Sequence, residues 1–239
     1  SILPGMAQTE KLTDYVNPFV GTDGYGNVYP GAQIPFGGIQ ISPDTDSRFY
    51  DAASGYKYNH LTLMGFSLTH LSGTGIPDLG DFLFIPGTGE MKLEPGTHED
   101  PDQGYRSRYS HDKEWASPNY YAVELADYGV KAEMTSGVRS GMFRFTYPES
   151  DNAFIMIDMN HTLWQSCEWS NLRMINDSTI TGYKLVKGWG PERHVYFTAT
   201  FSKKLTGLRF VQDKKPVIYN TSRFRSSYEA WGKNLMACI

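Results

Sequence analysis

The residues best suited to chemistry lie in residues 70–81, which read HLSGTGIPDLGD. This stretch holds two carboxylates three positions apart, Asp78 and Asp81, together with His70 and Ser72. Paired carboxylates can serve glycoside hydrolysis, and carboxylate oxygens can bind a hard metal ion. Aspartates in tight turns also commonly accept backbone N–H groups, and this structural interpretation stays open. A Ser-His-Asp triad is not expected, because consecutive loop residues rarely converge and no nucleophile elbow is present.

A second candidate is the run of glycines and prolines in residues 21–38, GTDGYGNVYPGAQIPFGG. This density of glycine and proline excludes a regular helix or a central strand. Tyr25, Asn27, Tyr29 and Phe36 stand between the glycines and offer stacking faces and hydrogen-bonding groups. Such chemistry suits a neutral, polyhydroxylated ligand better than an anion. The spacing of Gly24 and Gly26 does not match a dinucleotide loop, and an Ω-loop that caps a sheet is the structural alternative.

Three further groups combine aromatic side chains with polar ones. They are His111, Glu114 and Trp115; then Trp164, Glu168 and Trp169, expected in a loop; and Trp189 between two glycines. Each group could line a sugar site, and each has a plain alternative as a strand connection or as a tryptophan that covers a sheet edge. No group of cysteine and histidine has the spacing of a zinc site.

The composition is that of a globular protein, with 239 residues, 40% apolar and 20% charged. The net charge of -4 and the lack of a basic patch argue against a nucleic-acid partner. No apolar run is long enough for a membrane span. The two cysteines, Cys167 and Cys238, are compatible with one disulfide or with two buried thiols. The first ten residues do not form a signal peptide, so any such peptide is expected to have been removed.

The elements that must position these residues are strands. Apolar and polar residues alternate in several segments, turn signals recur at short intervals, and no window has helical periodicity. The predicted fold is all-β, an antiparallel β-sandwich of supersandwich type with long decorated loops and few short helices. Residues 1–14 are a lead-in segment and residues 15–239 are the domain. Strands are expected at 38–41, 61–66, 82–86, 121–126, 130–135, 142–147, 153–158, 195–202 and 234–239, with a surface loop at 87–104 and a turn at 231–233.

Several collinear motifs resemble the N-terminal domain of glycoside hydrolase family 92, the calcium-dependent exo-acting α-mannosidases. The matching segments are VNPFVGT (16–22), YPGAQIPFG (29–37), ISPDT (41–45), GFSLTHLSGTGIPDLGD (65–81), YSHDKEWASPNYYAVEL (109–125) and GWGPERHVYF (188–197). They extend over nearly the whole chain from Tyr15 onwards. Departures from the family pattern occur at Leu68, Tyr25 and Asn27, where histidines often stand, and they concern linkage specificity.

The resemblance implies a larger, two-domain enzyme. Its N-terminal β-sandwich would pack against a C-terminal (α/α)6 barrel that is absent from this chain, with the active site between them. The reaction would be inverting hydrolysis of terminal α-mannosides in glycans, of the α-1,2 type. Calcium would be bound mainly by the absent domain, which would also carry the catalytic acid and base. The localisation implied is periplasmic or secreted, in a bacterium.

The resemblance also assigns roles within this chain, none of them catalytic or metal-binding. The expected substrate contacts are Gly24, Tyr25, Gly26 and Asn27, with Tyr29, Phe36 and Trp189 for stacking or shaping, and His70, Ser72, Asp78 and Asp81 for orienting polar contacts. The alternative function is a stand-alone, non-enzymatic carbohydrate-binding module, which would share the sandwich and the aromatic loops.

Overall fold

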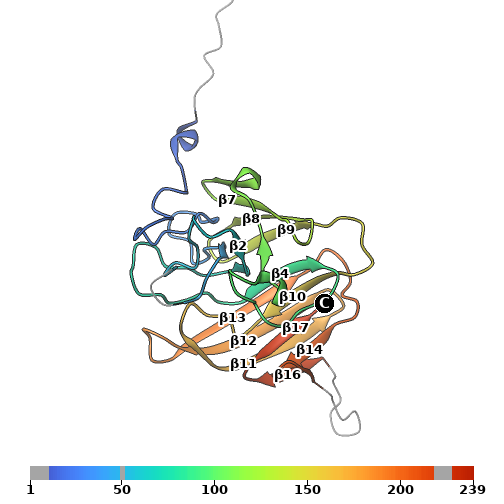
Figure 1. Ribbon diagram of the computed structural model, residues 1–239. Helices are drawn as coiled ribbons and strands as arrows, with labels where there is room; N and C mark the ends of the chain where they lie inside the picture. Colours follow the sequence, from blue (N-terminus) through green and yellow to red (C-terminus); the bar gives the residue numbers. More distant parts are fainter. Residues whose placement is uncertain (1–10, 49–51, 218–227) are drawn as a thin grey trace, which may run out of the picture.

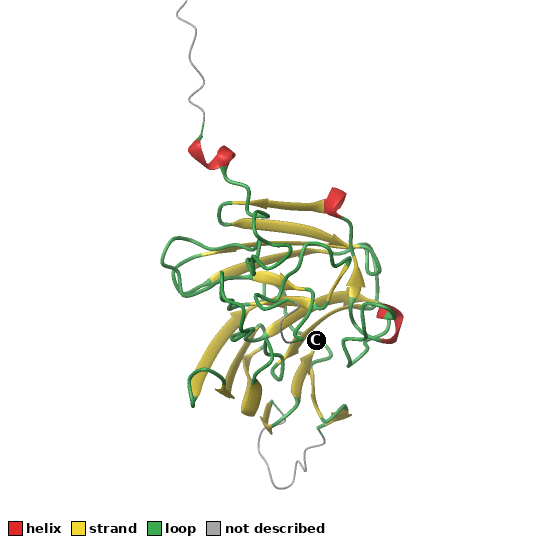
Figure 2. Cartoon of the chain, turned by 60° about the vertical axis from the view of Figure 1, so that its left-hand side comes forward, coloured by secondary structure: helices red, strands yellow, loops and turns green. Residues whose placement is uncertain are grey.

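The computed structural model describes residues 11–48, 52–217 and 228–239. Its regular structure is almost all β, as predicted, with three short 3-10 turns at Leu12–Tyr15, Pro101–Gln103 and His111–Lys113 (Figure 2). None of the described helices is long and apolar enough to cross a membrane. Of the predicted lead-in segment, residues 1–10 lie outside the described residues.

The central layer is a seven-stranded antiparallel sheet in the order β1-β3-β4-β10-β17-β14-β15. Its apolar side chains alternate between two cores: Phe84 and Ile157 pack on one face, and Ile85 and Met156 on the other. Burial on both faces explains the continuous apolar run that indicated β4. The strands are β1 (Ser42–Asp44), β3 (Gly65–Ser67), β4 (Leu83–Thr88), β10 (Ala153–Asp158), β17 (Leu235–Cys238), β14 (Arg209–Gln212) and β15 (Lys215–Pro216).

A four-stranded sheet, β13-β12-β11-β16, packs against one face of this central layer (Figure 1). Its strands are β13 (Arg193–Thr200), β12 (Thr179–Lys187), β11 (Ser166–Asn176) and β16 (Glu229–Gly232). The inner side chains, among them Leu172, Ile180 and Ala230, join the core with Phe82 and Phe84. Along β13, half-buried side chains that face this core alternate with exposed side chains that face outward.

A second four-stranded sheet is a meander of β6 (Glu114–Ser117), β7 (Tyr120–Leu125), β8 (Val130–Ser136) and β9 (Gly141–Thr146). It packs on residues of the first third of the chain, including Ile41 and Phe66. A small pair, β2 (Thr62–Leu63) with β5 (Ser107–Arg108), joins the segments that precede and follow β4 in the chain.

Several predicted elements need correction. The strand expected at 38–41 is β1 at Ser42–Asp44, because Ile41 makes only an isolated bridge with Ala32. The strand expected at 61–66 is two strands, since β2 pairs with β5 whereas β3 pairs with β1 and β4. The turn expected at 231–233 lies at 233–234, between β16 and β17, because Trp231 and Gly232 belong to β16.

The expected loop at Trp164, Glu168 and Trp169 is only partly a loop. Trp164 precedes β11, but Glu168 and Trp169 lie within the strand, where a register shift between Cys167 and Trp169 leaves a bulge. The bulge interrupts the alternation of apolar and polar residues, and this hid β11 from the sequence pattern. Cys167 and Cys238 are both buried, free thiols, so the structure contains two separate thiols rather than a disulfide.

Candidate functional site

Three loop segments meet on one side of the sandwich and form what we call the loop surface: residues 21–38, 70–81 and 187–193. The Gly73 N–H donates to the Asn27 carbonyl at 2.8 Å, and this bond joins the first two segments. The ring centroids of Tyr29 and His70 lie 5.1 Å apart. The Trp189 N–H donates to Asp78 Oδ2 at 3.0 Å and joins the third segment to the second. The structure therefore brings these predicted site segments together.

The tip of the first segment is a tight loop that needs its glycines. Gly24 and Asn27 have positive φ angles of 58° and 50°. A Cβ at Gly26 would stand 2.2 Å from the Gly21 carbonyl oxygen, so no larger residue fits this fold of the loop. The Val28 N–H closes the loop by donating to that same carbonyl group at 3.2 Å. As a result Tyr25 is held at the tip with 97% of its surface exposed.

His70 lies beneath this loop and is buried with its polar atoms engaged. Its Nδ1 lies 2.7 Å from the Gln40 carbonyl oxygen and its Nε2 lies 2.7 Å from Asp44 Oδ1. The other carboxylate oxygen of Asp44 lies 2.7 Å from His161 Nε2. Burial alone would raise the pKa of Asp44, but the two imidazoles more than offset it and hold the pKa below the ordinary value. His70 thus anchors the segment from inside.

Asp78 holds two loops together through backbone groups. Its Oδ1 accepts the Leu79 N–H at 2.6 Å, and its Oδ2 accepts the Trp189 N–H. The absence of a side chain at Gly188 permits this approach, since a Cβ there would stand 2.8 Å from Asp78 Oδ1. These contacts support the structural interpretation of Asp78, in which an aspartate in a tight turn accepts backbone N–H groups.

Asp81 is completely buried and faces two cations. Lys184 Nζ, also completely buried, lies 3.1 Å from Asp81 Oδ1, and Arg193 pairs with Oδ2. The hydroxyl of Thr69 donates to Oδ2 at 2.7 Å. Burial raises the pKa of Asp81, yet Lys184 and Arg193 outweigh it and lower the pKa overall. Asp81 is therefore an ionised structural partner, which is the opposite of a protonated general acid.

The remaining predicted residues divide by exposure. Gly24, Tyr25, Gly26, Ser72 and Trp189 are exposed, and Asn27 is half-buried. Tyr29 is buried and its hydroxyl donates to Gln33 Oε1 at 2.5 Å. Phe36 is fully exposed, but its turn is bound to the β8–β9 connection through the Gly38 N–H and the Val138 carbonyl. Direct contact with a ligand is thus open to the exposed set, whereas the buried residues support it.

The group around Glu114 is a packing network. The buried carboxylate accepts hydroxyl groups from Tyr56 at 2.9 Å and Tyr121 at 2.5 Å, and His111 Nδ1 lies 2.6 Å away. Trp115 follows Glu114 in β6 and therefore points to the opposite face of the sheet, where Lys131 Nζ lies 5.6 Å from its ring centroid. These contacts agree with the strand connection that the sequence left open.

Sequence reasoning missed Asp44, His161, Lys184 and Arg193, which complete the charged base of the loop surface. The one signal available was Lys184, which occupies an inward position between Gly182 and Val186 on a strand. A lysine at such a position requires a buried acidic partner. The identity of that partner, 103 positions earlier in the chain, could come only from the fold.

One described group could hold a metal ion, formed by Asp46, His60 and His98, whose ligand atoms lie within 4.8 Å of one another. Calcium takes six to eight oxygen ligands. Two imidazoles and a carboxylate that is already paired with Arg48 do not fit it. The calcium site that the family resemblance implies is therefore not formed by this group.

Comparisons with known proteins identify the family of the domain. Residues 15–238 match the profile of the Glycosyl hydrolase family 92 N-terminal domain. The chain is 30% identical over 139 residues to an uncharacterized secreted glycosidase of Arthroderma benhamiae, covering 57% of this chain and 17% of that protein.

Two solved structures are similar over most of the chain. One is the family 92 glycosyl hydrolase CcMan5, with a TM-score of 0.77 and 25% identity over 95% of this chain and 30% of that one. The other is the family 92 inverting mannosidase BT2199 of Bacteroides thetaiotaomicron, with a TM-score of 0.75 and 23% identity over 96% of this chain and 30% of that one. The chain thus spans less than a third of the length of each of these relatives.

Proposed function

Since the chain belongs to glycosyl hydrolase family 92 through its N-terminal domain, we propose that it is the substrate-contacting part of an exo-acting, inverting α-mannosidase. The substrate would be terminal mannose in glycans, of the α-1,2 type. The name of one structural neighbour, an inverting mannosidase, supports the reaction, and the description of the A. benhamiae relative as secreted supports an extracellular or periplasmic place of action.

The observation that carries the proposal is the arrangement of exposed and buried residues in the loop surface. Its tips expose Tyr25 and Trp189, whereas its base is a set of buried ion pairs centred on Asp44 and Asp81. A base of this kind fixes the backbone of the loops that carry the exposed aromatic and amide groups, so less conformational entropy is lost when a sugar binds. Aromatic faces pack on the C–H face of a pyranose ring, and the Asn27 amide can bond to its hydroxyl groups.

The acid and base would come from a C-terminal (α/α)6 domain. Inversion needs one carboxylic acid at the leaving oxygen and one carboxylate that activates water on the opposite face. Within the loop surface, Asp78 is bound to backbone N–H groups and Asp81 is paired with two cations, so neither is available for these roles. Calcium would likewise be held mainly by that domain, where it supplies a hard cation for sugar hydroxyl groups.

The proposal is tested with the full-length protein and with the present chain by itself. The full-length protein should release mannose from α-1,2-mannobiose, and proton NMR at early times should show β-mannose first. The present chain alone should release none. Early α-mannose would contradict inversion. Binding of mannose without hydrolysis by either polypeptide would instead support the stand-alone carbohydrate-binding module.

A further inference from the structure

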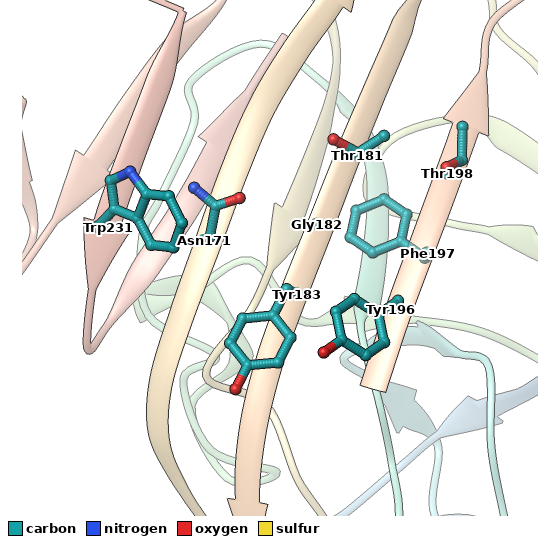
Figure 3. A pocket seen from close by; sticks show the side chains of 8 residues that line it. All are labelled: Asn171, Thr181, Gly182, Tyr183, Tyr196, Phe197, Thr198 and Trp231. Atoms are coloured by element: carbon teal, nitrogen blue, oxygen red, sulfur yellow. The ribbon is translucent and has the colours of Figure 1, made fainter. Parts of the chain in front are cut away.

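The outer face of the sheet β13-β12-β11-β16 carries a row of side chains that the loop surface does not include. The register pairs Tyr196 with Tyr183, Tyr183 with Asn171, and Asn171 with Trp231. These four residues therefore stand side by side across all four strands, and we call them the aromatic row (Figure 3). Adjacent strands lie about 4.8 Å apart, so the row extends over about 14 Å.

The aromatic row lines an open hollow of about 480 Å³. Tyr196 and Trp231 have 70% and 55% of their surface exposed, and the rings of Tyr183 and Tyr196 lie 4.9 Å apart. Thr181 and Thr198 add hydroxyl groups along one edge, as Figure 3 shows. Large aromatic side chains in such positions provide rigid contact area at a low entropic cost.

Hydrogen bonds hold the two middle side chains of the row, Asn171 and Tyr183, in place. Asn171 Nδ2 donates to the Ala230 carbonyl at 3.0 Å and to Glu229 Oε1 at 3.3 Å, which fixes the amide between Trp231 and Tyr183. The Tyr183 hydroxyl is bonded to His194 Nδ1 at 3.0 Å. The fixed amide and the fixed Tyr183 ring preorganise the middle of the row, which lowers the entropy lost when a ligand binds.

The charges around the row favour a neutral ligand. Arg173 and Glu229 are paired in register in the neighbouring row, so a cation and an anion stand opposite each other. Aromatic faces interleaved with an amide and threonine hydroxyls match a ligand that presents apolar C–H faces and hydroxyl edges in turn. A purely apolar partner would leave Asn171 Oδ1 and the hydroxyl groups of Thr181 and Thr198 with fewer hydrogen bonds than water gives them, at a cost in free energy.

We propose that the aromatic row binds a neutral oligosaccharide chain, as a second glycan-binding surface separate from the loop surface. The row contributes no group to hydrolysis. Its role is to hold a glycan strand on the protein while chain ends are presented elsewhere. The inference depends on the sheet geometry alone and does not require the proposed mannosidase activity.

The test uses calorimetric titration of the protein with two probes, a sulfur-linked α-1,2-mannotetraose that a mannosidase cannot cleave, and cellotetraose. Saturable binding of at least one probe is expected. Trp231→Ala and Tyr196→Ala should each weaken it by about tenfold. Tyr196→Phe, which keeps the ring, should weaken it less. Trp115→Ala removes a similarly exposed tryptophan from a different sheet and should leave binding unchanged.

Two outcomes would overturn the proposal. One is equal affinity of the wild-type and Trp231→Ala proteins, including the case in which neither binds. The other is that another part of the protein covers the row, which a Tyr196→Cys variant can detect. Its thiol is expected to react quickly with a maleimide, and more slowly when the probe is bound. If this thiol is unreactive in the whole protein without sugar, the row is an internal contact. Hydrolysis of a small aryl mannoside by the row variants should match wild type, which separates this result from a failure of the proposed activity.

Discussion

The carboxylate of Asp81 and the ammonium group of Lys184 lie 3.1 Å apart, and neither side chain is exposed. Asp81 follows the loop of residues 70–80, whereas Lys184 points inward from the middle of β12. Lys184 also donates to the His161 carbonyl at 2.6 Å. The pair therefore joins the loop surface to the sheet that carries the aromatic row, and it makes the position of the loops depend on the core.

Removal of Asp81 should be strongly destabilising. In Asp81→Ala the buried Lys184 loses its counter-ion, and loss of one partner of a buried pair costs about 3 to 5 kcal/mol. The free energy of unfolding in urea measures this. Asp177→Ala breaks an exposed pair with Lys204 and serves as the matched control, which should change the midpoint little. A similar small change for Asp81→Ala would show that the pair does not hold the fold.

Stability should fall at acid pH. The pKa values of Asp44 and Asp81 in the folded protein lie below their ordinary value of 3.8. A carboxyl group with a lowered pKa contributes stability that is present above pH 4 and is lost as pH falls through the folded value. The unfolding free energy should hence decline below about pH 4 because of these two groups.

The contribution of Asp44 can be isolated with Asp44→Asn. This variant should be less stable at neutral pH and should show a shallower decline in acid, because one of the titrating groups is gone. Parallel curves for variant and wild type between pH 5 and pH 2 would contradict the assignment.

The two thiols should be protected in the native state. Cys167 and Cys238 are buried and free, and burial raises the pKa of both, to about 11 for Cys238. Because the thiolate is the reactive form, labelling by a disulfide reagent should be slow in buffer and rapid in urea, with two thiols counted per chain. Rapid labelling of either thiol under native conditions would contradict the observed packing.

Calcium should have little effect on this chain alone. The one described group with metal-ligand spacing contains His60 and His98, which are unsuited to calcium. Addition of calcium or of a chelator should leave the melting temperature of the chain unchanged. A rise that depends on calcium concentration would reveal a site within the chain.

The sequence predicted the strands with clear alternation, such as β7, β8 and β13, and the buried run that forms β4. It did not predict β11 or β12, because a bulge at Glu168 and the inward Gly182 and Lys184 break the pattern. Segment composition was enough to select the loops that meet in the loop surface.

The partition of the candidate residues into exposed and buried sets could not be predicted. Both Asp78 and Tyr25 belong to glycine-rich loops, yet Asp78 is buried and accepts the Trp189 N–H, whereas Tyr25 is exposed at a tip. That difference depends on contacts between segments about 110 positions apart, as in the bond between Asp78 and Trp189. The register that forms the aromatic row likewise depends on strand pairing, which no local pattern specifies.

The central claim is that the loop surface of this domain contacts the mannoside during hydrolysis. The most direct test is kcat/KM for α-1,2-mannobiose, measured in the whole enzyme for Trp189→Ala against Trp115→Ala, which removes a similarly exposed tryptophan from the β6 strand. We predict a fall of about tenfold or more for Trp189→Ala and none for Trp115→Ala, with both variants as stable as wild type. Equal activity of the two variants would contradict the claim.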